Sequence, residues 1–230
     1  MSNKVVIVST SQQPKILVGC PTCDLYEYCL DEYLQTVRNL TYPNYDLLII
    51  DNSKNPDYHK KIKQAIKDDF IEPAVKRIVN SRNKLRKYAL ENNYDYFLSL
   101  EQDVIPPKDI IEQLLKHNKK AISAVVFNKF NNNLLPMIWK ENEKKLKFYQ
   151  IEELEPPRLE KIRTSSLSCI LIHKNILKKI EFRYEKDKNC FDDMFFCNDL
   201  KKEGFSLYVD TSIKCKHLIK NKTWKNIQKF

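Results

Sequence analysis

Short apolar runs alternate with amphipathic stretches through the first 130 residues of the chain. The apolar runs have the length of β-strands and hold few polar positions, which is the pattern of strands buried on both faces. The stretches between them repeat apolar residues every three or four positions, as one face of a helix does. The pattern predicts strands over 15–19, 46–50, 74–79, 94–100 and 121–127, and helices over 24–40, 58–69, 82–92 and 107–115.

This alternation predicts an α/β fold whose central sheet is Rossmann-like, mostly parallel and flanked by helices. Ligands of such sheets bind beyond the carboxyl ends of the strands. Three polar segments follow predicted strands and should therefore share one edge of the sheet: Pro21-Thr22, Asp51-Asn52-Ser53 and Glu101-Gln102-Asp103. Their coincidence predicts a binding site at that edge.

After residue 127 the pattern is less regular. It predicts a hairpin of 134–139 with 145–150, a strand over 164–172, a helix over 174–180, a helix over 192–203 that Gly204 ends, and strands over 206–210 and 213–218. No internal repeat or long linker separates these elements. We therefore expect a single domain over 1–230, with a first half over 15–128, a second half over 129–218 and a basic tail over 219–230.

The segment FLSLEQDVIPP ends an apolar run with two carboxylates, Glu101 and Asp103. Side chains two positions apart on a strand point the same way, so the two acids share a face while Gln102 points to the other. Two like charges this close raise each other's pKa unless a cation or a donor compensates. Either Mg²⁺ or Mn²⁺ binds there together with a phosphate, or Asp103 accepts from backbone amides in an acidic turn. The residues alone leave both readings open.

The glycine count excludes two common phosphate-binding loops. The chain holds 2 glycines, Gly19 and Gly204, too few for a G-x-G-x-x-G turn or a G-x-x-x-x-G-K loop. Bound phosphates would therefore need a metal and side chains. The net charge of +10 favours an anionic partner, although lysine-rich solvated surface explains it equally well. Because the charge is spread along the chain without an arginine-rich tract, we expect no nucleic-acid partner.

The chain has 7 cysteines and no apparent export signal, so we expect free thiols in a cytoplasmic protein. Cys20-Pro21-Thr22-Cys23 follows a predicted strand, as a thiol redox site would. Zinc bound by Cys20, Cys23, Cys215 and His217 is a second alternative. No apolar run reaches the ~20 residues of a membrane helix. The basic, aromatic tail over 220–230 either frays or touches the inner face of a membrane.

Four segments occur in an order that resembles a known family. NSRNKLRKYALENNYDYFLSLEQDVIPPKDIIEQLL places a basic helix before a strand that ends in two acids. KILVGCPTCD and YDLLIIDNSKN are strands with polar ends, and NCFDDMFFCNDLKKEGFSLYVDTSIKCKHL joins an acidic pair to a histidine. Over roughly 15–218 the chain resembles the GT-A-fold glycosyltransferases, particularly family-2-like enzymes. Glu101 stands where that family usually has aspartate.

The resemblance implies transfer of a sugar from a nucleoside-diphosphate sugar to a glycan, lipid-linked or protein acceptor hydroxyl, with Mn²⁺ or Mg²⁺ as cofactor. It implies donor contacts from Pro21, Thr22, Asp51, Asn52 and Gln102, and basic residues near the diphosphate at Arg82 and Arg86. It implies metal ligands at Glu101, Asp103 and His217, and a general base at Asp193, or at Asp192 beside it, in an inverting enzyme.

Several other interpretations stay open. Glu101 in place of aspartate leaves a non-catalytic nucleotide-sugar-binding relative as an alternative. A nucleotidyltransferase is a further alternative, disfavoured because it usually needs a glycine-rich opening loop. Asp192 and Asp193 equally suit the start of a helix, as an N-cap and a partner of the helix dipole. A lone histidine such as His217 is more often structural.

Overall fold

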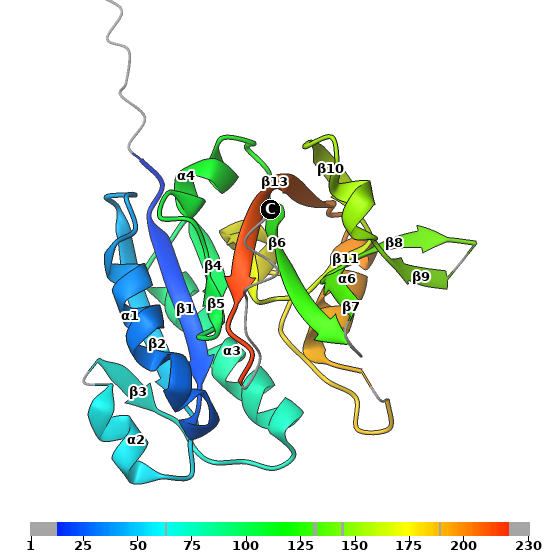
Figure 1. The fold of residues 1–230 in the computed structure, drawn as a ribbon. Helices are drawn as coiled ribbons and strands as arrows, with labels where there is room; N and C mark the ends of the chain where they lie inside the picture. The colour runs from blue at the N-terminus through cyan, green and yellow to red at the C-terminus, as the bar shows by residue number, and fades with distance from the viewer. Residues whose placement is uncertain (1–12, 63, 131–132, 144, 189, 221–230) are drawn as a thin grey trace, which may run out of the picture.

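The central sheet contains strands from both halves of the sequence (Figure 1). The structure, a computed structural model, describes residues 13–62, 64–130, 133–143, 145–188 and 190–220. The strand order of the larger sheet is β10-β13-β6-β12-β4-β1-β2-β3, with β5 paired to β13 and β7 to β6. A smaller sheet has the order β11-β8-β9.

The first half of the chain supplies neighbouring strands that run parallel: β4 (Tyr96–Leu100), β1 (Ile16–Thr22), β2 (Tyr45–Asp51) and β3 (Ala65–Lys67). Beyond β4 the sheet becomes mixed. β12 (Cys169–His173) runs antiparallel between β4 and β6 (Ala121–Phe130), and β13 (Leu207–His217) runs parallel to β6. The remaining strands are β5 (Val104–Ile105), β7 (Asn133–Pro136), β8 (Ile138–Asn142), β9 (Lys145–Phe148), β10 (Leu159–Ile162) and β11 (Thr164–Ser165).

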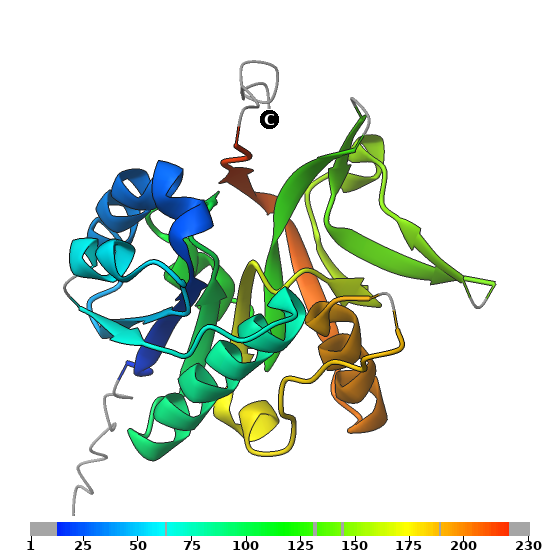
Figure 2. The ribbon, with the colours of Figure 1, turned by 90° about the horizontal axis from the view of Figure 1, so that it is seen from below.

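Helices cover both faces of the larger sheet (Figures 1 and 2). One face packs against α3 (Ala74–Glu91), α5 (Lys174–Leu177) and α6 (Asp192–Lys202). The other packs against α1 (Leu30–Arg38), α2 (Pro56–Lys61) and α4 (Ile110–Leu115). Two short 3₁₀ helices, η1 (Asp24–Cys29) and η2 (Ile151–Leu154), complete the described elements.

The uninterrupted apolar strands have a simple physical cause. Leu17 packs into the core on the α3 face, whereas its neighbours Ile16 and Val18 pack on the α1 face. Since successive side chains of a strand point to opposite faces, a sheet covered on both sides needs apolar residues at every position. The α/β fold class predicted from these runs is confirmed.

Two elements of the first half differ from the prediction. Residues 74–79 are not a strand but the first turns of α3, and the third parallel strand is β3, inside the segment predicted as a helix over 58–69. Ala74–Glu91 is a single helix whose buried positions include Val79, Leu85 and Ala89. The buried positions Arg82, Leu85 and Ala89 recur at helical spacing. The short apolar run over 74–79 fits a strand or a helix by itself, and this continuing period decides for helix.

Second-half elements lie close to their predicted places but connect differently. The predicted strand over 134–139 is divided, because β7 pairs back on β6 while β8 pairs with β9 in the projecting hairpin of Figure 1. The strands predicted over 206–210 and 213–218 are one strand, β13, whose register against β6 shifts between Val209 and Lys214. Gly204, with φ of 74°, follows α6 as the predicted stop.

The tail beyond residue 220 lies outside the described residues, so its predicted membrane contact stays a prediction. Within the described ranges, no helix has both the length and the apolar character that a membrane crossing needs.

Gly19→Ala should destabilise the fold more than the same change at Gly204. A Cβ at Gly19 would overlap the Phe97 ring and lie 3.1 Å from Leu85 Cδ2, whereas a Cβ at Gly204 meets nothing within 4 Å. We expect a loss of about 3 kcal/mol from overpacking at Gly19 and about 1 kcal/mol from the left-handed backbone at Gly204. Urea unfolding of the two variants measures both, and equal losses would contradict this packing.

Candidate active site

The predicted polar segments meet at the carboxyl ends of the parallel strands. The Thr22 hydroxyl, at the end of β1, donates to Gln102 Oε1 beyond β4, and Tyr58 OH donates to the same oxygen over 2.8 Å. The backbone N–H of Asn52 donates to the Thr22 carbonyl oxygen over 2.9 Å. Buried hydrogen bonds therefore join all three segments at one edge of the sheet.

A first cavity opens at this edge. Its lining includes four of the residues that the resemblance predicts to contact the donor: Pro21, Thr22, Asn52 and Gln102. Arg77 of α3 also lines it, although the sequence analysis did not single it out. The Arg77 Nε–H donates to Asn52 Oδ1 over 3.1 Å. A helix over 74–79 puts Arg77 on the same face as Ser81, four positions later. The Ser81 hydroxyl accepts from Asn52 Nδ2 over 3.0 Å, so a helix prediction for this segment would have pointed to Arg77.

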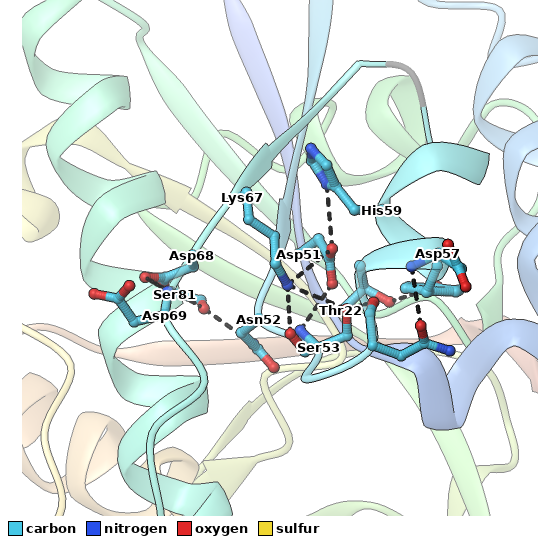
Figure 3. A network of polar contacts seen from close by, with 12 residues as sticks. Thr22, Asp51, Asn52, Ser53, Asp57, His59, Lys67, Asp68, Asp69 and Ser81 are labelled. Atoms are coloured by element: carbon cyan, nitrogen blue, oxygen red, sulfur yellow. Dashed lines mark hydrogen bonds and ion pairs between the residues drawn. The ribbon is translucent and has the colours of Figure 1, made fainter.

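Asp51 is not in the lining of this cavity, and Figure 3 shows its carboxylate beside Lys67, His59 and Ser53. Its carboxylate is fully buried, and it accepts from Ser53 N over 2.8 Å and from Lys67 Nζ over 3.3 Å. His59 Nδ1 lies 3.2 Å from the same carboxylate. These contacts fix the turn that carries Asn52 and Ser53. The structure thus does not bring Asp51 to the position that a direct donor contact requires.

A second cavity adjoins the first, and Tyr26, Ile78, Glu101 and Asp103 line both. Its volume is about 300 Å³, and it also contains the acidic pair at the start of α6 and His217 at the end of β13. The strand ends of the first half and the start of α6 therefore meet across one joint space. The carboxylates at this space are Glu101, Asp103, Asp192 and Asp193.

Arg82 is the central cation of the second cavity. Its side chain is 3% exposed, its Nε lies 2.8 Å from Asp192 Oδ2, and one of its terminal nitrogens pairs with Glu101 Oε1. The other donates to Ser99 Oγ over 2.7 Å. Each of the three guanidinium nitrogens thus contacts a protein oxygen, so Arg82 organises the carboxylates of this cavity.

Arg86, the other predicted diphosphate residue, lies elsewhere. Its Nε–H donates to the carbonyl oxygens of Leu177 and Ile180, at 2.7 and 2.9 Å, and it pairs with Glu181 over 2.9 Å. These contacts join α3 to the segment around α5. Neither cavity includes Arg86 in its lining, so the structure does not bring it to the site.

Burial and mutual repulsion leave two carboxyl groups with raised pKa values. Burial raises the pKa of Glu101, Arg82 opposes that shift, and Asp103 and Asp192 add to it. Burial, together with the neighbouring Asp192 charge, raises the pKa of Asp193 to about 7. Its Oδ1 accepts only from the adjacent Met194 N, over 2.7 Å. Asp193 is therefore poised to exchange a proton near neutral pH.

His217 and Asp103 contact each other where the two cavities meet. His217 Nε2 lies 3.0 Å from Asp103 Oδ2, and His217 Nδ1 lies 2.8 Å from the Phe127 carbonyl oxygen. Burial opposes the shift, but the hydrogen bond with Asp103 raises the pKa of His217. Nδ1 must donate, because its partner is a carbonyl oxygen. In a neutral ring Nε2 then carries a lone pair that faces the Asp103 carboxylate, so either a proton or a cation must lie between the two.

This pair fits a divalent cation. The second nitrogen of a metal-ligating histidine commonly donates to a backbone carbonyl, as His217 does here. Asp103 Oδ1 is buried and has no hydrogen-bond partner among the described residues. Adjacent ligands of an octahedral ion lie about 3 Å apart, since each is about 2.1 Å from the ion. Among the described residues, however, no group of three His, Cys, Asp or Glu side chains converges for a metal, because Glu101 turns toward Arg82.

The thiol alternatives find no support in the described residues. Burial raises the pKa of both Cys20 and Cys23, the opposite of the low pKa that redox thiols need. The four groups proposed for zinc do not assemble either, since no metal-binding group of three is present in the described ranges.

Comparison with known proteins places the chain in a family. The model of the family described as Glycosyl transferase family 2 matches residues 19–181. A search of curated proteins finds no match.

Two solved structures share the fold. The crystal structure of A197 from STIV aligns with a TM-score of 0.50 at 15% identity, covering 89% of this chain and 86% of that one. The crystal structure of GalNAc-T7 with UDP, GalNAc and Mn²⁺ aligns with a TM-score of 0.62 at 10% identity, covering 90% of this chain but 44% of that one. The predicted resemblance is confirmed: the chain has the GT-A fold and belongs to glycosyl transferase family 2.

Proposed function

We propose that this protein transfers a sugar from a nucleoside-diphosphate sugar to an acceptor hydroxyl, with Mn²⁺ or Mg²⁺ as cofactor. The observation that carries the proposal is the meeting of two cavities at Glu101 and Asp103, one lined by the three strand-end segments and the other holding the acidic pair of α6. Family membership supports the reaction class. The GalNAc-T7 structure, which contains UDP and Mn²⁺, supports the cofactor.

In this proposal the first cavity holds the nucleoside. Pro21, Thr22, Asn52 and Gln102 contact it, and Arg77 supplies the cationic group of this cavity. Asp51 acts indirectly, because its buried contacts with Ser53 and Lys67 hold the turn that carries Asn52. Arg86 has no role in donor binding.

Asp103 and His217 would hold the cation, which neutralises charge on the diphosphate leaving group when bound. Glu101 adds negative charge at the same joint, but its carboxylate stabilises Arg82 rather than completing the ligand set. A non-catalytic nucleotide-sugar binder is the second candidate function, since the incomplete ligand set favours it.

Asp193 would act as the general base that removes the acceptor proton. Asp192 is less suited, because its carboxylate is held by Arg82 over 2.8 Å. Among the described residues, one carboxylate oxygen of Asp193 has no hydrogen-bond partner, and the pKa of Asp193 is raised as general-base catalysis near neutral pH requires. Arg82 is then a positioning residue, which fixes Asp192 and so the start of α6.

Arg82→Met should destabilise the fold by about 3–5 kcal/mol at pH 8, because the buried Asp192 and the partly buried Glu101 lose their cation. The loss should shrink at pH 5, because the raised pKa of Glu101 makes that acid easier to protonate. Arg86→Met is the matched control: it loses hydrogen bonds mainly to carbonyl oxygens, so its cost should change little with pH. Urea unfolding at both pH values tests this, and a pH-independent loss for Arg82→Met would contradict the assignment.

Asp103→Ala should abolish cation-dependent release of nucleotide. The assay follows a panel of nucleoside-diphosphate sugars incubated with Mn²⁺, and compares the wild type with the variant. Loss by at least about 100-fold is expected if Asp103 contributes several kcal/mol of leaving-group stabilisation. Full activity of the variant would refute the cation assignment, and tight donor binding without turnover by the wild type would favour the non-catalytic binder.

Asp193→Asn should abolish transfer while stabilising the metal-free fold at pH 8. The folded pKa of about 7 lies above the ordinary value of 3.8, so stability from this group is full below about pH 4 and is lost as pH rises through 7. The neutral amide side chain of the variant does not lose this stability as pH rises. We therefore expect Asp193→Asn to raise the melting temperature by about 4 °C or more at pH 8 and to change it little at pH 4. Wild-type transfer should correspondingly rise with pH toward 7. A variant that loses both activity and stability at pH 8 would indicate a structural carboxylate instead.

A further inference from the structure

Phe191, in the lining of the second cavity, departs from the usual choice of N-cap residue and from the usual burial of a phenylalanine. It is the N-cap residue of α6, a position that favours Ser, Thr, Asp or Asn, and it makes no capping hydrogen bond. Its side chain is 67% exposed, although burial of a phenylalanine is strongly favourable. The residue also lies in the cavity lining, directly before Asp192 and Asp193. An apolar ring thus stands uncovered beside the proposed base.

The lining of the second cavity also includes polar side chains without charge. The hydroxyls of Ser166 and Ser168 lie 2.6 Å from each other, and each has capacity for further hydrogen bonds. Asn128 adds a side-chain amide to the lining. A hexose has the matching chemistry, because its hydroxyls need donors and acceptors at the ring edge while its C–H groups form a flat apolar face.

The charge of the cavity disfavours a phosphate-bearing acceptor. Its acidic residues outnumber Arg82 and His217, and Arg82 is almost fully buried and engaged. A lipid phosphate would meet like charge there. A serine or threonine hydroxyl of a peptide would suit the base, but it offers no flat apolar face to cover Phe191.

We propose that Phe191 is the stacking platform for the acceptor and that the acceptor is a carbohydrate, bound with a C–H face on this ring and a hydroxyl directed to Asp193. The inference rests on the proposed function and narrows its acceptor class to glycans. It makes Phe191 a specificity-determining residue whose contribution is to acceptor binding and not to the donor.

The test separates acceptor binding from chemistry. An array of immobilised glycans is probed with the wild-type chain in the presence of UDP and Mn²⁺, and with Phe191→Ala and Phe191→Trp. The wild type should bind a defined set of glycans, Phe191→Ala should weaken that binding about tenfold, and Phe191→Trp should retain it. Phe130→Ala is the matched control, since Phe130 is 42% exposed and lies outside the linings of both cavities.

The kinetic arm measures nucleotide release with and without each bound glycan, a polyprenyl phosphate, or a serine- and threonine-containing peptide. Glycans should accelerate release, and Phe191→Ala should raise the KM for the glycan about tenfold, whereas Phe130→Ala should leave that KM unchanged. Acceleration by the lipid or the peptide alone, no glycan binding by the wild type, or equal binding by Phe191→Ala would overturn the proposal. Glycan binding without any nucleotide release would instead overturn the proposed transferase function while leaving the platform intact.

Discussion

The site depends on one buried cation. Arg82 reaches from α3 to Glu101 beyond β4 and to Asp192 at the start of α6, and so links the strand ends of the first half to a helix of the second. A guanidinium suits this place because its planar set of donors can serve three partners at once. Removing it leaves like charges buried together, which is far costlier than losing an exposed ion pair.

That arrangement divides the acids at the site into different roles. Asp192 and Glu101 are held by Arg82, Asp103 is held by His217, and Asp193 is left with a raised pKa. The two cavities join where these groups lie, and in the proposed reaction this connected space holds both the leaving group and the acceptor hydroxyl.

Part of the site could be predicted from strand order alone. Residues after consecutive parallel strands must share one edge, and the contacts among Thr22, Asn52 and Gln102 follow from that rule. The rule does not fix which way a side chain turns. Asp51 follows its strand as expected, yet its carboxylate pairs with Lys67 and His59 and is not in the lining of the cavity. Arg86, one helical turn after Arg82, points to carbonyl oxygens near α5 instead of toward the site.

By itself the sequence determined the α/β class, the edge of the sheet that carries the site and the family, because these depend on periodicity and on the order of segments. Tertiary structure alone decided that 74–79 is helix, that β12 runs between β4 and β6, and that Arg77 and Phe191 line the cavities. The physical reason is that the spacing of apolar residues in a segment reflects only which of its faces can be buried. Partners that neutralise a charge come from segments more than 100 residues away in the sequence, as Arg82 and Asp192 do, and only the folded chain brings them together.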